Sequence, residues 1–309
     1  MNKLSKKELE TLESTFIKIQ RSVEEGIKKL NVSPPIRVAK VWKRDLGGGG
    51  KSISITGDNI EKAAINYSSI SGKKLPDSSI AASIKNTSHT FHALGVSAIV
   101  HPMNPFCPTS HMNVRIFLQL GKNNIIENWW IGGGFDLTPF FPTKEESSKW
   151  HSRAKLCVDN FNKRYYKKFA QNCDDYFYLP HRKEKRGIGG IFFDQLQHKA
   201  IEDSLMFLEE IAKCYIETYV ELVELNKKHK FTAQDREFQL YRRGRYVEFN
   251  LLFDRGTKFG IESNGRTESI LASMPPAVNW PFRISADINK KEKKLLRFID
   301  KKWNEHIKL

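Results

Sequence analysis

The stretch HPMNPFCPTSHMNVRIFLQL, residues 101–120, carries the pattern that decides the fold. Its three prolines predict an extended first part, because a proline ring restricts its own φ and disfavours helix at the residue before it. From His111 onward polar and apolar side chains alternate, and a strand sends alternate side chains to opposite faces. We therefore predict a strand over 111–120 with His111, Asn113 and Arg115 on one face. The opposite face is apolar and consists of Met112, Val114, Ile116, Leu118 and Leu120.

The polar face of this strand has two interpretations. A proton carrier, an amide and a fixed cation that point into one space are typical of a pocket wall for an anionic ligand. The same alternation also fits a half-buried strand whose polar face meets water. The residues alone leave both open.

The rest of the chain alternates irregularly between helical and strand-like segments. We predict helices over 1–31, 143–165, 201–229 and 288–307, and strands within 36–71 and over 94–100, 125–131 and 239–253. Residues 268–274 fit either a short strand or a helix. No regular βαβ rhythm, repeat or flexible linker is visible. The sequence therefore predicts an α+β fold, a large and mainly antiparallel sheet flanked by helices, as a single domain over 1–309.

Composition limits the function classes. The chain of 309 residues is 39% hydrophobic and 28% charged, which suits a soluble globular protein, and its net charge is +16. Such a charge suits a nucleic-acid-binding protein, but the lysines occur as scattered pairs, as expected of solvated helix faces. Several arginines instead concentrate within 242–266, and a guanidinium binds carboxylates bidentately. The charge is therefore compatible with a small polyanionic substrate as well as with nucleic acid; steeply salt-dependent binding of RNA would favour the latter.

The cysteines and the apolar runs indicate a compartment. The four cysteines form no C-x-x-C pair, which fits reduced thiols. No apolar run approaches the length of a membrane span, and residues 1–10 lack the apolar region of a secretion signal. We expect a cytoplasmic protein.

Glycine-rich segments offer further candidates. Residues 47–52 read GGGGKS, but a phosphate-binding loop needs glycine at position 45, which is Asp45, so that loop is excluded. A hairpin or a substrate-facing turn remains. Gly132, Gly133 and Gly134 indicate either the end of a strand with a bend or a close backbone approach to a flat ligand.

Two further sets of residues suggest chemistry. Asp254 and Arg255 stand at the end of the strand predicted over 239–253, where they fit either a base and an electrostatic clamp or a structural ion pair. Four histidines could form a metal cluster, as in a metal-dependent hydrolase, although their spacing is no ligand signature: His101, His111, His151 and His181. Chelation and a metal assay would decide that alternative.

Four motifs together resemble the oxygen-dependent coproporphyrinogen III oxidase family of heme biosynthesis. They are HPMNPFCPTSHMNVR, WWIGGGFDLTPFFP, DDYFYLPHRKEKRGIGGIFFD and YRRGRYVEFNLLFDRGTKFGIESNGRTESILASMPP, in collinear order between about Lys40 and Trp280. The resemblance implies a homodimer with a large antiparallel sheet. It also implies that two propionates of coproporphyrinogen III are converted to vinyls with O2 as co-substrate, giving protoporphyrinogen IX, CO2 and H2O2.

The resemblance also implies roles for single residues. His111 corresponds to the proton donor, and substrate contacts correspond to Ser97, Asn113, Val114, Arg115, Asn264, Gly265 and Arg266. Family members are described with metal-binding histidines at His101, His111, His151 and His181, although several work without metal, so a divalent metal stays open. The dimer-forming part corresponds to about 246–280. We expect no flavin, heme or nicotinamide, with Asp254 and Arg255 acting beside His111.

Overall fold

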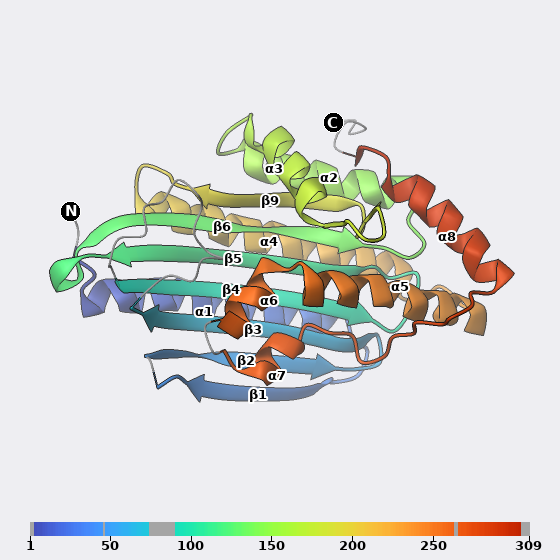
Figure 1. The fold of residues 1–309 in the computed structure, drawn as a ribbon, viewed down its shortest axis with the longest axis horizontal. Helices are drawn as coiled ribbons and strands as arrows, with labels where there is room; N and C mark the ends of the chain where they lie inside the picture. The colour runs from blue at the N-terminus through green and yellow to red at the C-terminus, as the bar shows by residue number, and fades with distance from the viewer. Residues whose placement is uncertain (1–2, 46, 74–89, 263–264, 304–309) are drawn as a thin grey trace.

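The centre of the molecule is a seven-stranded sheet in the order β1-β2-β3-β4-β5-β6-β9, in which every neighbouring pair is antiparallel (Figure 1). The computed structural model describes residues 3–45, 47–73, 90–262 and 265–303. The strands are β1 Ile36–Lys43, β2 Gly48–Thr56, β3 Ile60–Gly72, β4 Thr90–Pro102, β5 Thr109–Leu120, β6 Ile126–Thr138 and β9 Gly189–Leu196. A small hairpin pairs β7 Tyr178–Leu179 with β8 Glu184–Lys185. The predicted α+β fold with a mainly antiparallel sheet is confirmed.

Helices cover both faces of the sheet (Figure 1). On one face α1 Lys6–Lys29 packs on β3 and β4, and α4 Ile201–Asn226 packs on β5 and β6. Near the edge, α2 Lys144–Asp159 and α3 Tyr165–Tyr176 pack on β9. The other face carries α5 Ala233–Leu252, α6 Arg255–Glu262 and α7 Thr267–Leu271, and α8 Ala286–Ile299 contacts α5. None of the described helices is long and apolar enough to span a bilayer.

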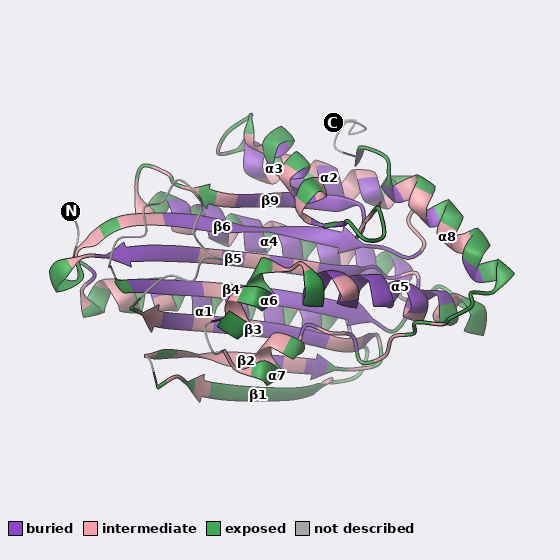
Figure 2. Cartoon of the chain, in the orientation of Figure 1, coloured by how far each residue is buried: buried purple, intermediate pink, exposed green. Residues whose placement is uncertain are grey.

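The main core lies between the sheet and the helices α1 and α4. Met112, Val114, Ile116 and Leu118 of β5 are fully buried there, as the alternation in 111–120 predicts (Figure 2). One continuous apolar cluster extends from Leu4 to Trp303. Two smaller apolar clusters lie apart from it, one around Phe117 and Trp130 and one around Phe177 and Phe249.

Strand β6 corrects the expectation that a strand ends at the three glycines, because it continues through them to Thr138, with an irregular register against β9 between Ile131 and Gly133. A Cβ on Gly133 would lie 2.4 Å from the Asn113 carbonyl oxygen, and one on Gly134 only 2.0 Å from the Ile191 carbonyl oxygen. Gly134 also has a φ of +137°, which disfavours other residues. These glycines let the strands on both sides approach β6 closely.

The strand predicted over 239–253 is wrong, because these residues lie in or directly after helix α5. The helix begins with a capping box between Thr232 and Asp235. Its residues are buried on nearly every side, so apolar alternation does not distinguish strand from helix. Arg242 and Arg243 are also buried, where they pair with Glu184 and Glu61, respectively.

Several predicted boundaries also change. The helix predicted over 143–165 divides into α2 and α3, and the segment 268–274 contains helix α7. The proline segment is not extended, because residues 103–107 turn between β4 and β5 and the Cys107 amide donates to the Asn104 carbonyl at 3.0 Å. Helix α8 begins earlier than predicted, after its cap at Ser285, and ends at Ile299; residues 304–307 of the predicted range lie outside the described residues. The predicted long helices over 1–31 and 201–229 are present as α1 and α4.

Candidate active site

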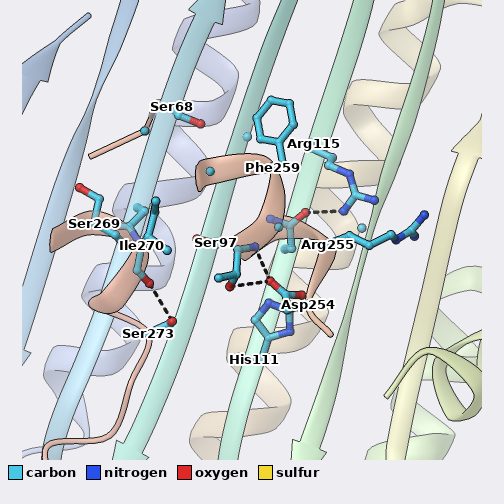
Figure 3. A pocket seen from close by; sticks show the side chains of 18 of the residues that line it. Ser68, Ser97, His111, Arg115, Asp254, Arg255, Phe259, Ser269, Ile270 and Ser273 are labelled. Carbon is cyan, nitrogen blue, oxygen red and sulfur yellow. Dashed lines mark hydrogen bonds between the residues drawn. The ribbon is translucent and has the colours of Figure 1, made fainter. Parts of the chain in front are cut away.

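A cavity of about 300 Å³ lies between the sheet and the segment that includes α6 and α7 (Figure 3). Ser97, His111 and Arg115 line it from the sheet, while Asp254 and Arg255 line it from the segment that crosses in front. In the strand register Ser97 pairs with Asn113, which brings the polar faces of β4 and β5 side by side. The polar face of residues 111–115 is therefore a cavity wall and not a solvent-facing surface.

Most residues expected at the site line this one cavity: Ser97, His111, Asn113, Arg115, Asp254, Arg255, Gly265 and Arg266. The structure corrects the expectation that the Val114 side chain contacts the substrate, because this side chain is fully buried in the core on the opposite face of β5. A strand cannot present three consecutive side chains to one cavity. Asn264 lies outside the described residues.

A buried chain of charges orients His111. Its Nδ1 lies 3.1 Å from Oδ1 of Asp136, the residue opposite it in the β5–β6 register. Asp136 in turn accepts two hydrogen bonds from Nη2 of Arg186, at 2.8 and 2.9 Å, and Nη1 of Arg186 donates to Asn250. Both charged side chains are almost completely buried, at 2% and 1% exposed. This arrangement assigns the proton on Nδ1 and directs Nε2 away from the ion pair.

The charge state of Asp136 follows from its neighbours. Burial alone raises the pKa of a carboxyl group, but the Arg186 guanidinium and the His111 ring bring the pKa of Asp136 below its ordinary value. The guanidinium also stacks on the Phe177 ring, 4.0 Å from its centroid. Asp136 is therefore an ionised acceptor that can stabilise a protonated His111.

Asp254 is held by the first turn of α6. Its Oδ2 accepts from the Thr257 amide at 2.7 Å and from the Thr257 hydroxyl at 3.1 Å, as an N-cap does. Its Oδ1 accepts from the Tyr176 hydroxyl at 2.9 Å. Burial and the Asp254 carboxylate raise the pKa of Tyr176, so this phenol stays protonated and donates. Asp254 thus lines the cavity in one defined orientation.

A structural ion pair between Asp254 and Arg255 is one interpretation of the sequence. In the structure Arg255 pairs instead with Asp194. Nη2 of Arg255 lies 3.0 Å from Oδ2 of Asp194, and Nη2 of Arg115 lies 3.0 Å from Oδ1 of the same carboxylate. Arg115 also donates to Asn113 at 2.8 Å. On the other side of the cavity Arg266 pairs with the exposed Glu268 at 2.9 Å. Cations thus line the cavity on more than one side.

Aromatic and aliphatic side chains form the remaining walls. One apolar wall consists of Trp42, Ile70, Ala93, Phe117 and Phe259. On another side Tyr176 stacks on Phe192 with the ring centroids 4.3 Å apart and the planes 8° from parallel. A ligand with a flat apolar body and charged substituents matches such a lining.

The structure does not bring together the four histidines that the resemblance relates to metal binding. They bind separate partners: His101 the Ser273 carbonyl at 2.9 Å, His111 the Asp136 carboxylate at 3.1 Å, His151 the Ile188 carbonyl at 2.8 Å, and His181 the Glu248 carboxylate at 2.8 Å. Within the described residues no three His, Cys, Asp or Glu side chains are arranged to hold a metal ion. The four histidines therefore do not fit a shared metal centre within one chain.

Sequence reasoning missed the partners that organise the site. Asp136, Arg186, Asp194 and Tyr176 all line the cavity or contact a residue that does. Each lies within a motif that carries the family resemblance, but nothing in the one-dimensional pattern shows what it contacts. Only the strand register, which places His111 opposite Asp136, reveals the first pair.

Comparison of the sequence with known proteins identifies a family. The family model described as coproporphyrinogen III oxidase matches residues 11–304. The oxygen-dependent coproporphyrinogen-III oxidase of Francisella tularensis subsp. novicida (strain U112) is 41% identical over 294 residues, which cover 93% of this chain and 95% of that protein. The protein of the same name from subsp. holarctica (strain OSU18) is 40% identical over the same shares. Because the family model matches residues 11–304 and these relatives are about 40% identical over 93% of this chain, the chain belongs to the coproporphyrinogen III oxidase family.

Proposed function

We propose that this protein catalyses the O2-dependent conversion of coproporphyrinogen III to protoporphyrinogen IX, a step of heme biosynthesis. The observation that carries the proposal is one cavity that gathers His111, Asp254 and several arginines, Arg115, Arg255 and Arg266 among them, beside apolar walls, in a chain of this family. The substrate has an apolar macrocycle and four propionates. Its charge and shape are complementary to that lining.

The reaction balances without any further redox partner. For each propionate, R–CH2–CH2–COOH and O2 give R–CH=CH2, CO2 and H2O2. One hydrogen leaves the carbon next to the ring, the carboxyl group leaves as CO2, and O2 accepts two electrons. We infer that the electron-rich pyrrole itself reacts with O2, so that no flavin, heme or nicotinamide takes part, and we assign no step to a metal.

Arg115, Arg255 and Arg266 bind propionates in this proposal. A guanidinium pairs bidentately with a carboxylate, and these pairs strengthen when water is excluded. Ser97 and Asn113 add neutral polar contacts on the sheet side of the cavity. The macrocycle contacts the apolar walls. Its pyrrole N–H groups then donate to Asp254, because the other carboxylate of the cavity, Asp194, is paired with Arg115 and Arg255.

Asp254 and His111 carry the proton chemistry. Asp254 polarises or deprotonates a pyrrole N–H and thereby raises the electron density of the ring that O2 attacks. Nε2 of His111 takes or delivers a proton, and the imidazolium form is stabilised by Asp136. Arg255 stabilises negative charge near the reacting propionate.

The test is incubation with coproporphyrinogen III in air and under strict anaerobiosis. We expect protoporphyrinogen IX, measured by fluorescence after oxidation to the porphyrin, only in air, with two H2O2 and two CO2 per ring. An Arg115→Gln variant should retain the fold and lose most of its substrate affinity. Arg153→Gln on α2, with a side chain that is 52% exposed, is the matched control. Equal product without O2 would refute the proposal.

We also propose that the protein forms a homodimer through the region 246–280. Five large apolar side chains of this region are exposed by between 44% and 64%: Leu251, Leu252, Ile261, Leu271 and Trp280. Clustered exposed apolar side chains mark contact surfaces. A second copy of the chain is the partner that would cover them.

The expected compartment is the cytoplasm. All four cysteines are free thiols, which fits a reducing environment. Fractionation of cells that express the protein tests this placement.

A further inference from the structure

Asp194, at the sheet edge on β9, joins two arginines that come from different parts of the chain. Its Oδ1 binds Arg115 of β5 and its Oδ2 binds Arg255 of α6, both at 3.0 Å. One carboxylate therefore spans from the floor of the cavity to the helix that covers it. All three side chains line the cavity and are only partly buried, between 24% and 44% exposed.

We propose that Asp194 is a positioning residue that holds Arg115 and Arg255 as one preset pair for a propionate of the substrate. The inference rests on the proposed function and adds a residue that contacts the arginines rather than the reacting atoms. Its physical basis is preorganisation. Side chains that are already ordered lose less conformational entropy when the ligand binds.

The backbone around this group is shaped to admit it. Gly132 lies opposite Arg115 in the β5–β6 register. A Cβ at this position would lie 2.7 Å from Oδ1 of Asp194 and 2.9 Å from Cζ of Arg115. The glycine thus leaves room for the ion pair. On the other side of the carboxylate Arg255 lies over the rings of Tyr176 and Phe192, 5.1 and 5.5 Å from their centroids.

The two contributions of Asp194 to substrate affinity oppose each other. The negative charge of Asp194 repels the tetracarboxylate substrate. Its hydrogen bonds, however, order Arg115 and Arg255, the two cations that attract the substrate. The carboxylate is partly exposed, so the repulsion is weak and is screened further by salt. We therefore expect ordering to dominate at about 0.3 M salt, where the Debye length is below about 8 Å.

Two variants separate charge from position. Gly132→Ala disturbs the pair without changing any charge, and Asp194→Asn removes the charge at constant volume. At about 0.3 M salt both should raise the KM for coproporphyrinogen III about tenfold, the scale expected from the ordering of two side chains, with kcat within about threefold of wild type. Asp203→Asn, at an exposed position near the start of α4, is the matched control and should leave both constants unchanged.

A double-mutant cycle distinguishes this role from a merely structural one. In an Arg115→Gln, Arg255→Gln background, Asp194→Asn should change KM by less than about twofold, because the residues that it positions are gone. An additive tenfold effect in that background would overturn the inference. So would an unchanged KM in both Gly132→Ala and Asp194→Asn.

Binding of coproporphyrin III, the oxidised tetracarboxylate, gives a readout that needs no turnover. Fluorescence anisotropy of this porphyrin should show weaker binding to both variants than to wild type. If wild type binds the porphyrin but does not turn over the porphyrinogen, the proposed function fails while the inference on Asp194 is still tested. If wild type and both variants bind it equally, the inference on Asp194 fails.

Discussion

Asp254 caps a helix and lines the cavity with one carboxylate. It accepts from the Thr257 amide as the N-cap of α6, and it lines the cavity. Asparagine caps a helix about as well as aspartate does. The substitution Asp254→Asn therefore removes the negative charge while it keeps the cap.

We predict that Asp254→Asn lowers turnover at least about a hundredfold, the range of a lost general base, with little change in stability. Steady-state kinetics and urea unfolding measure the two effects. Asp254→Ala is the comparison, because it should cost a further amount of about 1 kcal/mol in stability through the lost cap. Full turnover by the asparagine variant with normal substrate binding would show that the carboxylate has no role in proton transfer.

The lowered pKa values of His101 and His151 make the stability of the protein depend on pH. Burial, the largest cause, lowers the pKa of His101 to about 3 and that of His151 to about 4. An unfolded histidine has a pKa of about 6.5, so the unfolded state binds protons first as the pH falls. Stability is then complete above about pH 6.5 and is lost progressively toward pH 4.

We predict that the free energy of unfolding falls by up to about 1.4 kcal/mol per pH unit for each of these histidines between about pH 6 and pH 4.5. His151→Gln should remove one such contribution and flatten the slope, whatever it costs at pH 7. Urea unfolding across this pH range measures it. Parallel slopes for the variant and the wild type would contradict the assignment.

Among the elements, β6 connects the two strands that carry residues of the site. It lies between β5, which carries His111, and β9, which carries Asp194. Its close approach to β9 depends on Gly134, where an added Cβ would lie 2.0 Å from the Ile191 carbonyl oxygen. Overpacking of this kind typically costs about 1–3 kcal/mol.

We predict that Gly134→Ala destabilises the protein by at least about 2 kcal/mol, because the φ of +137° adds strain to the overpacking. Chemical denaturation measures the loss. Gly95→Ala is the milder comparison, since its added Cβ would meet no atom closer than 3.3 Å. Equal stability of the two variants would mean that β6 and β9 can separate at little cost.

Elements also show where prediction from sequence succeeds and where it fails. The alternation over 111–120 is correct because one face of β5 meets the core and the other meets the cavity. The same reasoning fails for α5, whose residues are buried on almost all sides. There Arg242 and Arg243 belong to the arginines that suggested an anionic partner, whereas in the folded protein they are buried and pair with Glu184 and Glu61.

At the scale of the whole molecule, the proposed dimer makes a prediction about association. Leu252, at the end of α5, is 53% exposed within the region 246–280, and Leu156 of α2 is 52% exposed outside it. Leu252→Glu should shift wild-type dimers to monomers, because it places a charge in an apolar contact. Sedimentation velocity measures the change, and Leu156→Glu should leave the dimer intact. A wild-type monomer, or identical behaviour of both variants, would contradict the proposed interface.

The sequence by itself determined the class of fold, strand β5 with its two unlike faces, the long helices α1 and α4, and several polar residues of the cavity lining. These features follow from local periodicity and from long family motifs. Only the tertiary structure decided that α5 is a helix, that β6 continues through its glycines, and that Asp136 and Asp194 organise His111 and the arginines. Those facts depend on strand register and on contacts between residues far apart in the chain, such as Arg115 and Asp194, which no local pattern encodes.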